Sequence, residues 1–225
     1  LYLANQDRIA QQVQHREASE FKKDKLKVLA ELTKLRQICC DPRLHYEDYK
    51  AGSAKLDTCM ELVHGALDGG HRILLFSQFT GMLDIIGKRL AKEDIAFLKL
   101  TGASSKESRA KMVAQFQAGE VPVFLISLKA GGVGLNLTAA DVVIHYDPWW
   151  NVAAQDQATD RAHRIGQQHA VTVYKLIAKD TIEERIMQMQ ESKRDLVNSV
   201  LGGDGISSAL FTREDVLALL GGDGR

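Results

Sequence analysis

The chain has 225 residues, a length that suggests one large domain or two small ones. Its 29 basic and 29 acidic residues cancel, which argues against a protein that holds nucleic acid or a membrane mainly by bulk charge. Hydrophobic residues make up 45% of the sequence, enough for a folded core, but no apolar run is long enough to cross a membrane. The three cysteines show no C-x-x-C spacing, so we expect neither a disulfide framework nor a metal site.

Residues 1–54 predict a helical lead-in followed by a polar loop. The stretch 1–36 contains no Pro or Gly, and apolar residues recur at helical spacing toward its end. Asp41-Pro42 should end the helix, because the residue before a proline avoids the helical conformation.

Residues 55–180 alternate short apolar runs with amphipathic stretches, a pattern that predicts a parallel sheet with helices on both sides. The runs also suit strands that are buried on both faces. In such sheets ligands bind beyond the carboxyl ends of the strands, so we look for functional residues there. We expect strands in 72–77, 95–100, 121–127, 141–146 and 171–178, and helices in about 55–68, 80–92, 105–118 and 151–161.

Residues 181–225 predict a long helix over about 181–200 and a small helical appendage behind it. Two Gly-Gly-Asp-Gly segments flank a short helix over 213–220, for which Thr212 is a suitable N-cap.

A glycine-rich loop follows the strand that ends at Ser127. Its glycines would let backbone N–H groups approach an anion, or they would form a tight turn between strand and helix. The loop is not a Walker A motif, because no Gly-Lys-Ser/Thr follows. It is not a dinucleotide fingerprint either, because Leu137 stands where glycine or alanine is needed.

Two further features follow the next strand. Trp149 and Trp150 are adjacent, and they either fill the core or contact a partner domain or nucleic acid. Arg161 and Arg164 are three residues apart, so on a helix they share a face. Such a pair is either a solvated charged surface or, beside a glycine-rich loop, a phosphate clamp.

Four segments together resemble helicase motifs IV, V and VI of superfamily 2, and specifically those of the Swi/Snf-type DNA-translocating ATPases. The segments are ILLFSQF (73–79), LTG (100–102), ISLKAGGVGLNLTAADVVIHYDPWWN (126–151) and QATDRAHRIGQ (157–167). Gln167 supports this assignment, because DEAD-box RNA helicases usually carry arginine at the equivalent position. Leu128 and Val152 resemble bacterial members of the family, whereas some eukaryotic members carry Thr and Pro there.

The resemblance implies a RecA-like α/β fold, a parallel sheet sandwiched by helices, with helical N- and C-terminal extensions. It implies that the chain is the second lobe of a two-lobe ATPase, and that a first lobe with Walker A and DExH motifs lies outside these 225 residues. ATP and Mg²⁺ would be held mainly by that first lobe. The chain alone is therefore expected to be inactive.

The resemblance also assigns site residues. Arg161 and Arg164 match the family's arginine fingers, which contact the γ-phosphate of ATP, and Gln157 matches the glutamine that positions them. Gly132, Gly134 and Asn136 match residues that approach the nucleotide. The positions that match DNA-contacting residues, with the choice between the two tryptophans left open, are Ser77, Gln78, Thr101, Gly102, Ser127, Lys129, Trp149 and Trp150.

The function that this resemblance implies is ATP-dependent translocation along, or remodelling on, double-stranded DNA. The expected partners are double-stranded DNA, the first lobe and a DNA-bound protein, with no membrane. The expected location is the bacterial cytoplasm at the nucleoid, or the nucleus if the source is eukaryotic. Two alternatives are a non-enzymatic interaction module with a RecA-like fold and the second lobe of a superfamily 2 RNA helicase, which Gln167 disfavours.

Overall fold

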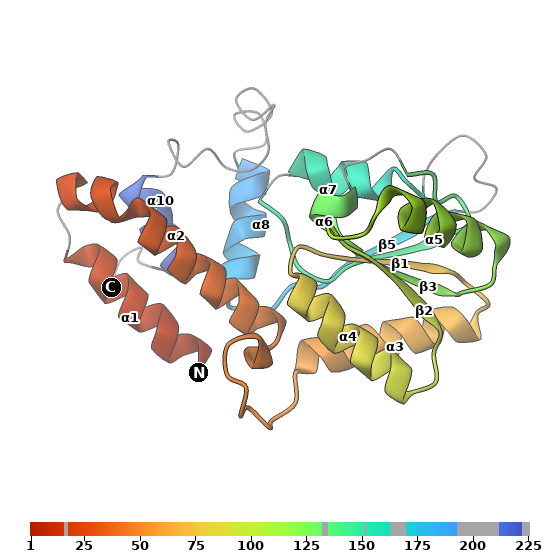
Figure 1. Cartoon of the computed structure of the whole chain (residues 1–225). Helices are drawn as coiled ribbons and strands as arrows, with labels where there is room; N and C mark the ends of the chain where they lie inside the picture. The colour runs from red at the N-terminus through yellow and green to blue at the C-terminus, as the bar shows by residue number, and fades with distance from the viewer. Residues whose placement is uncertain (16–17, 132–134, 151, 163–169, 193–211, 222–225) are drawn as a thin grey trace. The chain divides into compact units, whose positions relative to one another are not determined.

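The computed structural model describes residues 1–15, 18–131, 135–150, 152–162, 170–192 and 212–221 (Figure 1). The chain folds into two compact units. One, the sheet unit, is Ala51–Ile177. The other, the terminal unit, combines Leu1–Lys50 with Ala178–Arg225, so the two ends of the chain, treated separately above, fold together.

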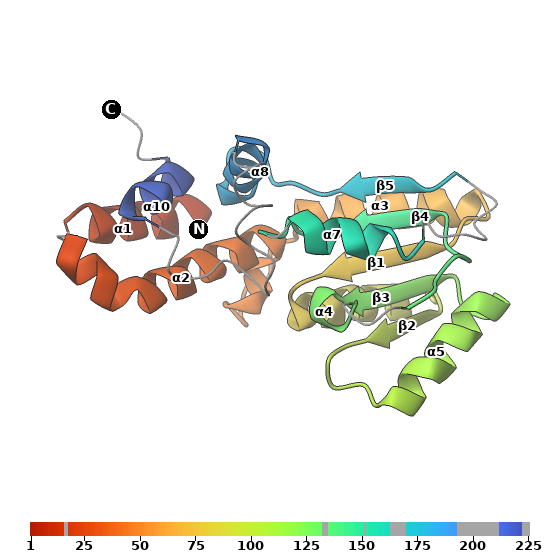
Figure 2. The same cartoon turned by 90° about the horizontal axis from the view of Figure 1, so that it is seen from above.

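The sheet unit is built on five parallel strands in the order β2-β3-β1-β4-β5 (Figure 2). The order and direction confirm the parallel α/β sheet expected from the alternating pattern. All five expected strands are present: β1 (Ile73–Ser77), β2 (Phe97–Leu100), β3 (Val123–Ser127), β4 (Val142–His145) and β5 (Thr172–Lys175). In the central pair the register places Ser77 opposite Ser127, so both strands reach the same edge of the sheet with a serine.

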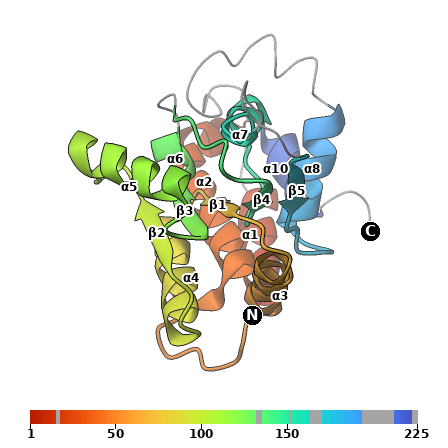
Figure 3. The ribbon, with the colours of Figure 1, turned by 90° about the vertical axis from the view of Figure 1, so that its right-hand side faces the viewer.

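Helices cover both faces of this sheet. Figure 3 shows α3 (Ala54–Asp68) and α4 (Thr80–Lys92) on one face, and α5 (Lys106–Ala118), α6 (Leu128–Gly131) and α7 (Val152–Thr159) on the other. Side chains alternate along a strand, so each buried strand contributes to two cores. The core beneath α5 and α7 contains Leu74, Phe76, Leu100, Phe116, Phe124, Ile126, Val143 and Ala158.

The expectation of strands buried on both faces holds for β1, β3 and β4, and it is wrong for the two edge strands, β2 and β5. In β2 only Leu100 is buried, and Lys99 is exposed. All residues of β1, β3 and β4 are buried, whereas all four of β5 are exposed, including Val173 and Tyr174. The physical reason is position in the sheet. β2 pairs only with β3 and β5 only with β4, and the apolar composition of an edge strand alone does not reveal its position.

The terminal unit consists of α1 (Tyr2–Gln14), α2 (Ala18–Cys40), the short 3₁₀ helix η1 (Pro42–Leu44), α8 (Ile182–Ser192) and α10 (Arg213–Leu220). The end of α2 immediately before Asp41-Pro42 confirms the predicted stop. Thr212 is confirmed as the N-cap of α10, where its hydroxyl accepts from the N–H of Asp215. The helix expected over 181–200 is described only as far as Ser192.

The helical lead-in is two helices rather than one continuous helix. α1 ends at Gln14, where the Arg213 guanidinium of α10 donates to the carbonyl oxygens of Val13 (3.1 Å) and Gln14 (2.8 Å). Because helix-end carbonyls need donors, this contact replaces the hydrogen bonds that a continuing helix would supply. The break has no Gly or Pro signal, and so it could not be read from the sequence.

Hydrogen bonds join the two ends of the chain within the terminal unit. Gln6 Nε2 donates to the carbonyl oxygen of Leu220 at 2.6 Å, and the Tyr2 hydroxyl accepts from the N–H of Ile182 at 2.6 Å. Burial is the main reason that the pKa of Tyr2 is raised above its usual value. Among the residues that the structure describes, no helix is both long and apolar enough to span a bilayer.

Candidate nucleic-acid interface

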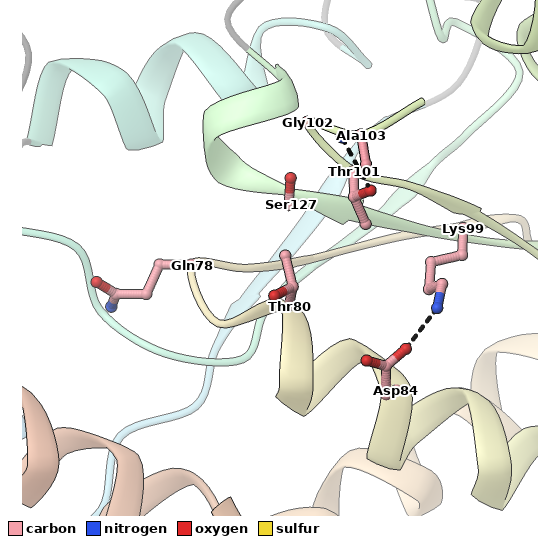
Figure 4. Close-up of a pocket in the computed structure, with 8 residues that line it drawn as sticks. All are labelled: Gln78, Thr80, Asp84, Lys99, Thr101, Gly102, Ala103 and Ser127. Atoms are coloured by element: carbon pink, nitrogen blue, oxygen red, sulfur yellow. Dashed lines mark hydrogen bonds and ion pairs between the residues drawn. The ribbon is translucent and has the colours of Figure 1, made fainter. Parts of the chain in front are cut away.

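A pocket of about 420 Å³ opens at the carboxyl ends of β1, β2 and β3 (Figure 4). Four of the eight residues predicted to contact DNA line it, each from the end of a strand or the loop after it. The residues around the pocket are Gln78, Thr80, Asp84, Lys99, Thr101, Gly102, Ala103 and Ser127. The lining offers hydroxyl groups, an amide and loop backbone, which are the groups that protein–DNA interfaces use on phosphates.

Two of the pocket hydroxyls are held by backbone N–H groups. Thr101 Oγ1 accepts from the N–H of Ala103 at 3.4 Å, and Ser127 Oγ accepts from the N–H of Ala130 at 3.4 Å. An oxygen that accepts in this way still carries its own proton as a donor. Each hydroxyl therefore keeps its own proton as a donor. Thr101 is half-buried, whereas Ser127 is only 2% exposed.

Ser77 lies beneath the pocket rather than in it. Its side chain is fully buried, and its hydroxyl donates to Asp147 Oδ1 at 2.6 Å. Asp147 also accepts from the backbone N–H of Gln78 at 3.3 Å and from Gln78 Nε2. The buried Asp147 carboxylate thus fixes the loop after β1, which carries Gln78 into the pocket lining.

The pocket holds one ion pair. Lys99 Nζ on β2 donates to Asp84 Oδ1 on α4. Gly87 lets α4 approach β2 this closely, because a Cβ atom there would lie 3.0 Å from the ring of Phe97. Sequence reasoning missed both members of the pair, and also Thr80. Their signal, a lysine in a strand and an aspartate on a helix, is indistinguishable from an ordinary solvated surface.

The two tryptophans differ in their surroundings. Trp149 is half-buried against the core beneath α5 and α7, and its backbone N–H donates to Gln155 Oε1 at 3.3 Å. Trp150 is also half-buried but does not belong to that core cluster. Trp149 therefore fits the core-filling alternative left open above.

The glycine-rich loop is described at its two ends only. Gly132 and Gly134 lie outside the described residues, as does the side chain of Lys129. Arg109 of α5 donates to the carbonyl oxygen of Ala130 at 3.0 Å, which ties the start of the loop to the helix layer. Asn136, at the far end, is exposed.

The segment after α7 carries the two arginines that are predicted to face the nucleotide. α7 ends at Thr159, so Arg161 lies in the turn beyond the helix, and Arg164 lies outside the described residues. Arg161 is buried, with 3% of its surface exposed, and its carbonyl oxygen accepts from the N–H of Leu137 at 3.1 Å. Gln157 is exposed on α7. The Leu137 contact brings the far end of the glycine-rich loop beside the arginine segment.

A buried histidine supports that segment from below. His145 of β4 stacks on Phe76 with ring centroids 5.4 Å apart, and its Nε2 lies 2.9 Å from Thr159 Oγ1. Burial, with a smaller contribution from the charge of Lys175, lowers the pKa of His145 to about 4. The ring is therefore neutral at physiological pH. Among the described residues, no group of three or more His, Cys, Asp or Glu could hold a metal ion.

Comparison with known proteins identifies the family of the chain. The model of the helicase conserved C-terminal domain matches residues 54–166. The chain is 42% identical over 195 residues to the putative ATP-dependent helicase/translocase YwqA of Bacillus subtilis, a match that covers 83% of this chain and 21% of that protein. This chain spans about a fifth of the length of the bacterial relatives that it matches.

Solved structures give the same result. The Sulfolobus solfataricus SWI2/SNF2 ATPase C-terminal domain is 31% identical, with a TM-score of 0.77 over 97% of this chain and 90% of that one. The S. solfataricus SWI2/SNF2 ATPase core in complex with double-stranded DNA is 35% identical, with a TM-score of 0.79 over 97% of this chain and 46% of that one. The chain therefore belongs to the helicase conserved C-terminal domain family, and within it to the SWI2/SNF2 type.

Proposed function

We propose that the chain is the second lobe of an ATP-dependent translocase that moves along double-stranded DNA. The observation that carries the proposal is the hydroxyl-lined pocket at the carboxyl ends of β1, β2 and β3. The similarity to an ATPase core in complex with double-stranded DNA supports the choice of ligand. The relative named helicase/translocase supports the choice of activity.

On this proposal the pocket contacts the phosphate backbone through Gln78, Thr101, Gly102 and Ser127. Neutral hydroxyl and amide donors bind phosphate more weakly than arginine forks do, which suits a surface that must release each phosphate before it takes the next. Such contacts carry no base information, so binding is largely independent of sequence. Ser77 acts indirectly, through Asp147, by positioning Gln78.

The tryptophans divide their roles in this proposal. Trp149 supports the loop from the core, and Trp150 is the one offered to DNA. Lys129, two residues after Ser127 in the chain, adds a positive charge to the DNA side.

The nucleotide side of the proposal rests on the segment after α7. Arg161 and Arg164 act as arginine fingers toward the γ-phosphate of an ATP bound to the other lobe, and Gln157 positions them. Gly132, Gly134 and Asn136 line the loop that links this segment to the DNA side. Removal of a finger costs about 10³–10⁵ in rate. ATP and Mg²⁺ are bound mainly by the first lobe, so this chain alone hydrolyses no ATP.

The test is ATPase activity of the 225-residue chain, alone and with a first lobe supplied in trans. We expect no activity from the chain alone, and activity with both lobes that duplex DNA stimulates. Stimulation by single-stranded RNA instead would identify an RNA helicase lobe. Inactivity under every condition, with protein partners still bound, would identify an interaction module.

The fingers are tested in the two-lobe enzyme by Arg164→Ala and Arg161→Ala. Each should abolish DNA-stimulated ATPase activity while the dissociation constant for duplex DNA stays nearly unchanged. Because Arg161 is buried, the unfolding midpoint of its variant must be measured alongside, and Arg164→Ala supplies the second, independent readout. ATPase activity retained in a folded variant would refute the assignment of that residue.

A further inference from the structure

The charged residues that line the DNA-facing pocket are already paired with each other. Among the eight described lining residues only Lys99 and Asp84 carry a charge, and the ammonium of Lys99 donates to the carboxylate of Asp84 (Figure 4). Both side chains are partly exposed, 39% for Lys99 and 51% for Asp84. An ion pair this exposed is weak, because water screens it and two long side chains must be ordered.

We propose that Lys99 is a further ligand for a DNA phosphate, and that Asp84 is the internal anion it exchanges for that phosphate. The inference rests on the proposed function and names a device of the same site. A carboxylate oxygen and a phosphate oxygen accept the same charge-assisted hydrogen bond from an ammonium group. Exchange of the Asp84 carboxylate for a DNA phosphate therefore costs little free energy, whereas a lysine without such a carboxylate would bind the DNA backbone more tightly.

The local structure favours this exchange. Neighbours of Lys99 on β2, Leu98 and Leu100, pack on the opposite face of the sheet, so Lys99 itself points toward α4 and the pocket. Asp84 is four residues beyond Thr80, and residues so spaced share one face of a helix. The pair consequently lies among the hydroxyls of Thr80 and Thr101, within reach of any anion that they bind.

The experiment is duplex-DNA binding by the 225-residue chain, followed by fluorescence anisotropy at several salt concentrations. Asp84→Asn should tighten binding at low salt by about three- to tenfold and steepen the slope of log K against log[salt] by about 0.9, because Lys99 then brings one unneutralised charge. Lys99→Gln should weaken binding by a similar factor. The double variant should lose the gain, since the effect of Asp84 runs through Lys99.

Matched controls keep the outcome decisive. Asp57→Asn is the control for Asp84→Asn, because it makes the same change of net charge at an exposed ion pair with Arg89 that is not part of the pocket lining. Lys92→Gln is the control for Lys99→Gln, and it lies at the far end of α4. Equal tightening by Asp57→Asn, or a gain from Asp84→Asn that survives Lys99→Gln, would overturn the exchange while leaving the proposed function intact. No duplex binding by the wild-type chain would overturn both.

Discussion

His145 Nε2 lies 2.9 Å from Thr159 Oγ1, which joins the third buried strand to the last residue of α7. The carbonyl oxygen of Thr159 also accepts from the backbone N–H of Ala162, at 3.0 Å, so the same residue anchors the turn that contains Arg161. A strand in the middle of the sheet unit thereby holds the segment to which we assign the arginine fingers. Burial disfavours the charged ring, so the imidazole in this contact is neutral at physiological pH.

The stability of the sheet unit should fall as the pH drops from about 6.5 to 4. The pKa of His145 is lowered to about 4 in the folded chain, so in this range the unfolded chain binds a proton that the folded chain excludes. The contribution is fully present above pH 6.5 and amounts to on the order of 3 kcal/mol. Urea unfolding measures it through tryptophan fluorescence, because both tryptophans of the chain lie in the sheet unit.

His145→Gln keeps a hydrogen-bonding group near Thr159 and has no proton to gain, so its stability should change less over this pH range. His15→Gln, at an exposed position, should follow the wild-type chain. A His145→Gln profile parallel to that of the wild type would contradict the explanation.

Asp147→Asn should destabilise the sheet unit. The substitution puts amide hydrogens where Ser77 and Gln78 now donate, and each buried donor left unsatisfied costs about 1–3 kcal/mol. Ser77→Ala removes one donor only and should cost about 1 kcal/mol. Asp156→Asn, on the exposed side of α7, should change the unfolding free energy by less than about 0.5 kcal/mol. An unchanged unfolding free energy for Asp147→Asn would show that the hydrogen bonds from Ser77 and Gln78 to Asp147 are not formed.

Two glycine-to-alanine changes should act in opposite directions. Gly119 caps α5 in the left-handed conformation with φ = 86°, and a Cβ atom there would also displace the end of the flexible Arg72 side chain. Gly119→Ala should therefore cost about 1 kcal/mol or more. Gly65, inside α3, has nothing within 4 Å of a new Cβ atom, so Gly65→Ala should stabilise by about 0.5–1 kcal/mol. Thermal unfolding midpoints of the two variants give the comparison, and equal signs would refute it.

Thr212→Ala should destabilise the terminal unit by about 1 kcal/mol, because it removes the reciprocal cap with Asp215 at the start of α10. Thr33→Ala is the matched control, since the Thr33 hydroxyl bonds back to the carbonyl oxygen of Leu29 within α2 and caps nothing. The terminal unit contains no tryptophan, so tryptophan fluorescence does not report on its unfolding. Hydrogen exchange of the amides in α1 and α10 measures it instead. Faster exchange in both variants alike would argue against the cap.

The sheet was predictable because its three central strands are continuous apolar runs, and only burial on both faces favours such runs. The exposure of β5 was not predictable, since an edge strand and a central strand can share the composition of residues 171–178. Leu26 fits the apolar spacing of the lead-in but is 74% exposed, whereas Val28, Leu32 and Leu35 are buried. The helical spacing predicts that one face of α2 is apolar. Which residues at the edge of that face pack on α1 depends on the break between the two helices, and this break has no local sequence signal.

The site divides in the same way. Gln78, Thr101, Gly102 and Ser127 could be placed at one edge because parallel strands end together, and the structure brings them into one pocket. Lys99 and Asp84 could not, because only the crossing of α4 over β2 brings together two residues fifteen apart in the chain. Sequence reasoning also missed Asp147, although a carboxylate two residues after a buried strand is a signal that can point to a buried anchor.

The pairing of the chain's two ends has a practical consequence for dissecting the protein. Truncation before Ala51 would remove the partners of α8 and α10 and leave Ile182, Val216 and Leu219 without cover, and truncation after Ile177 would do the same to Ile9 and Val13. Either deletion removes one of the two segments of the terminal unit, and the apolar surface left exposed on the other segment favours aggregation. A soluble core is therefore better obtained by cutting at both ends together, which leaves residues 51–177 as a single continuous piece.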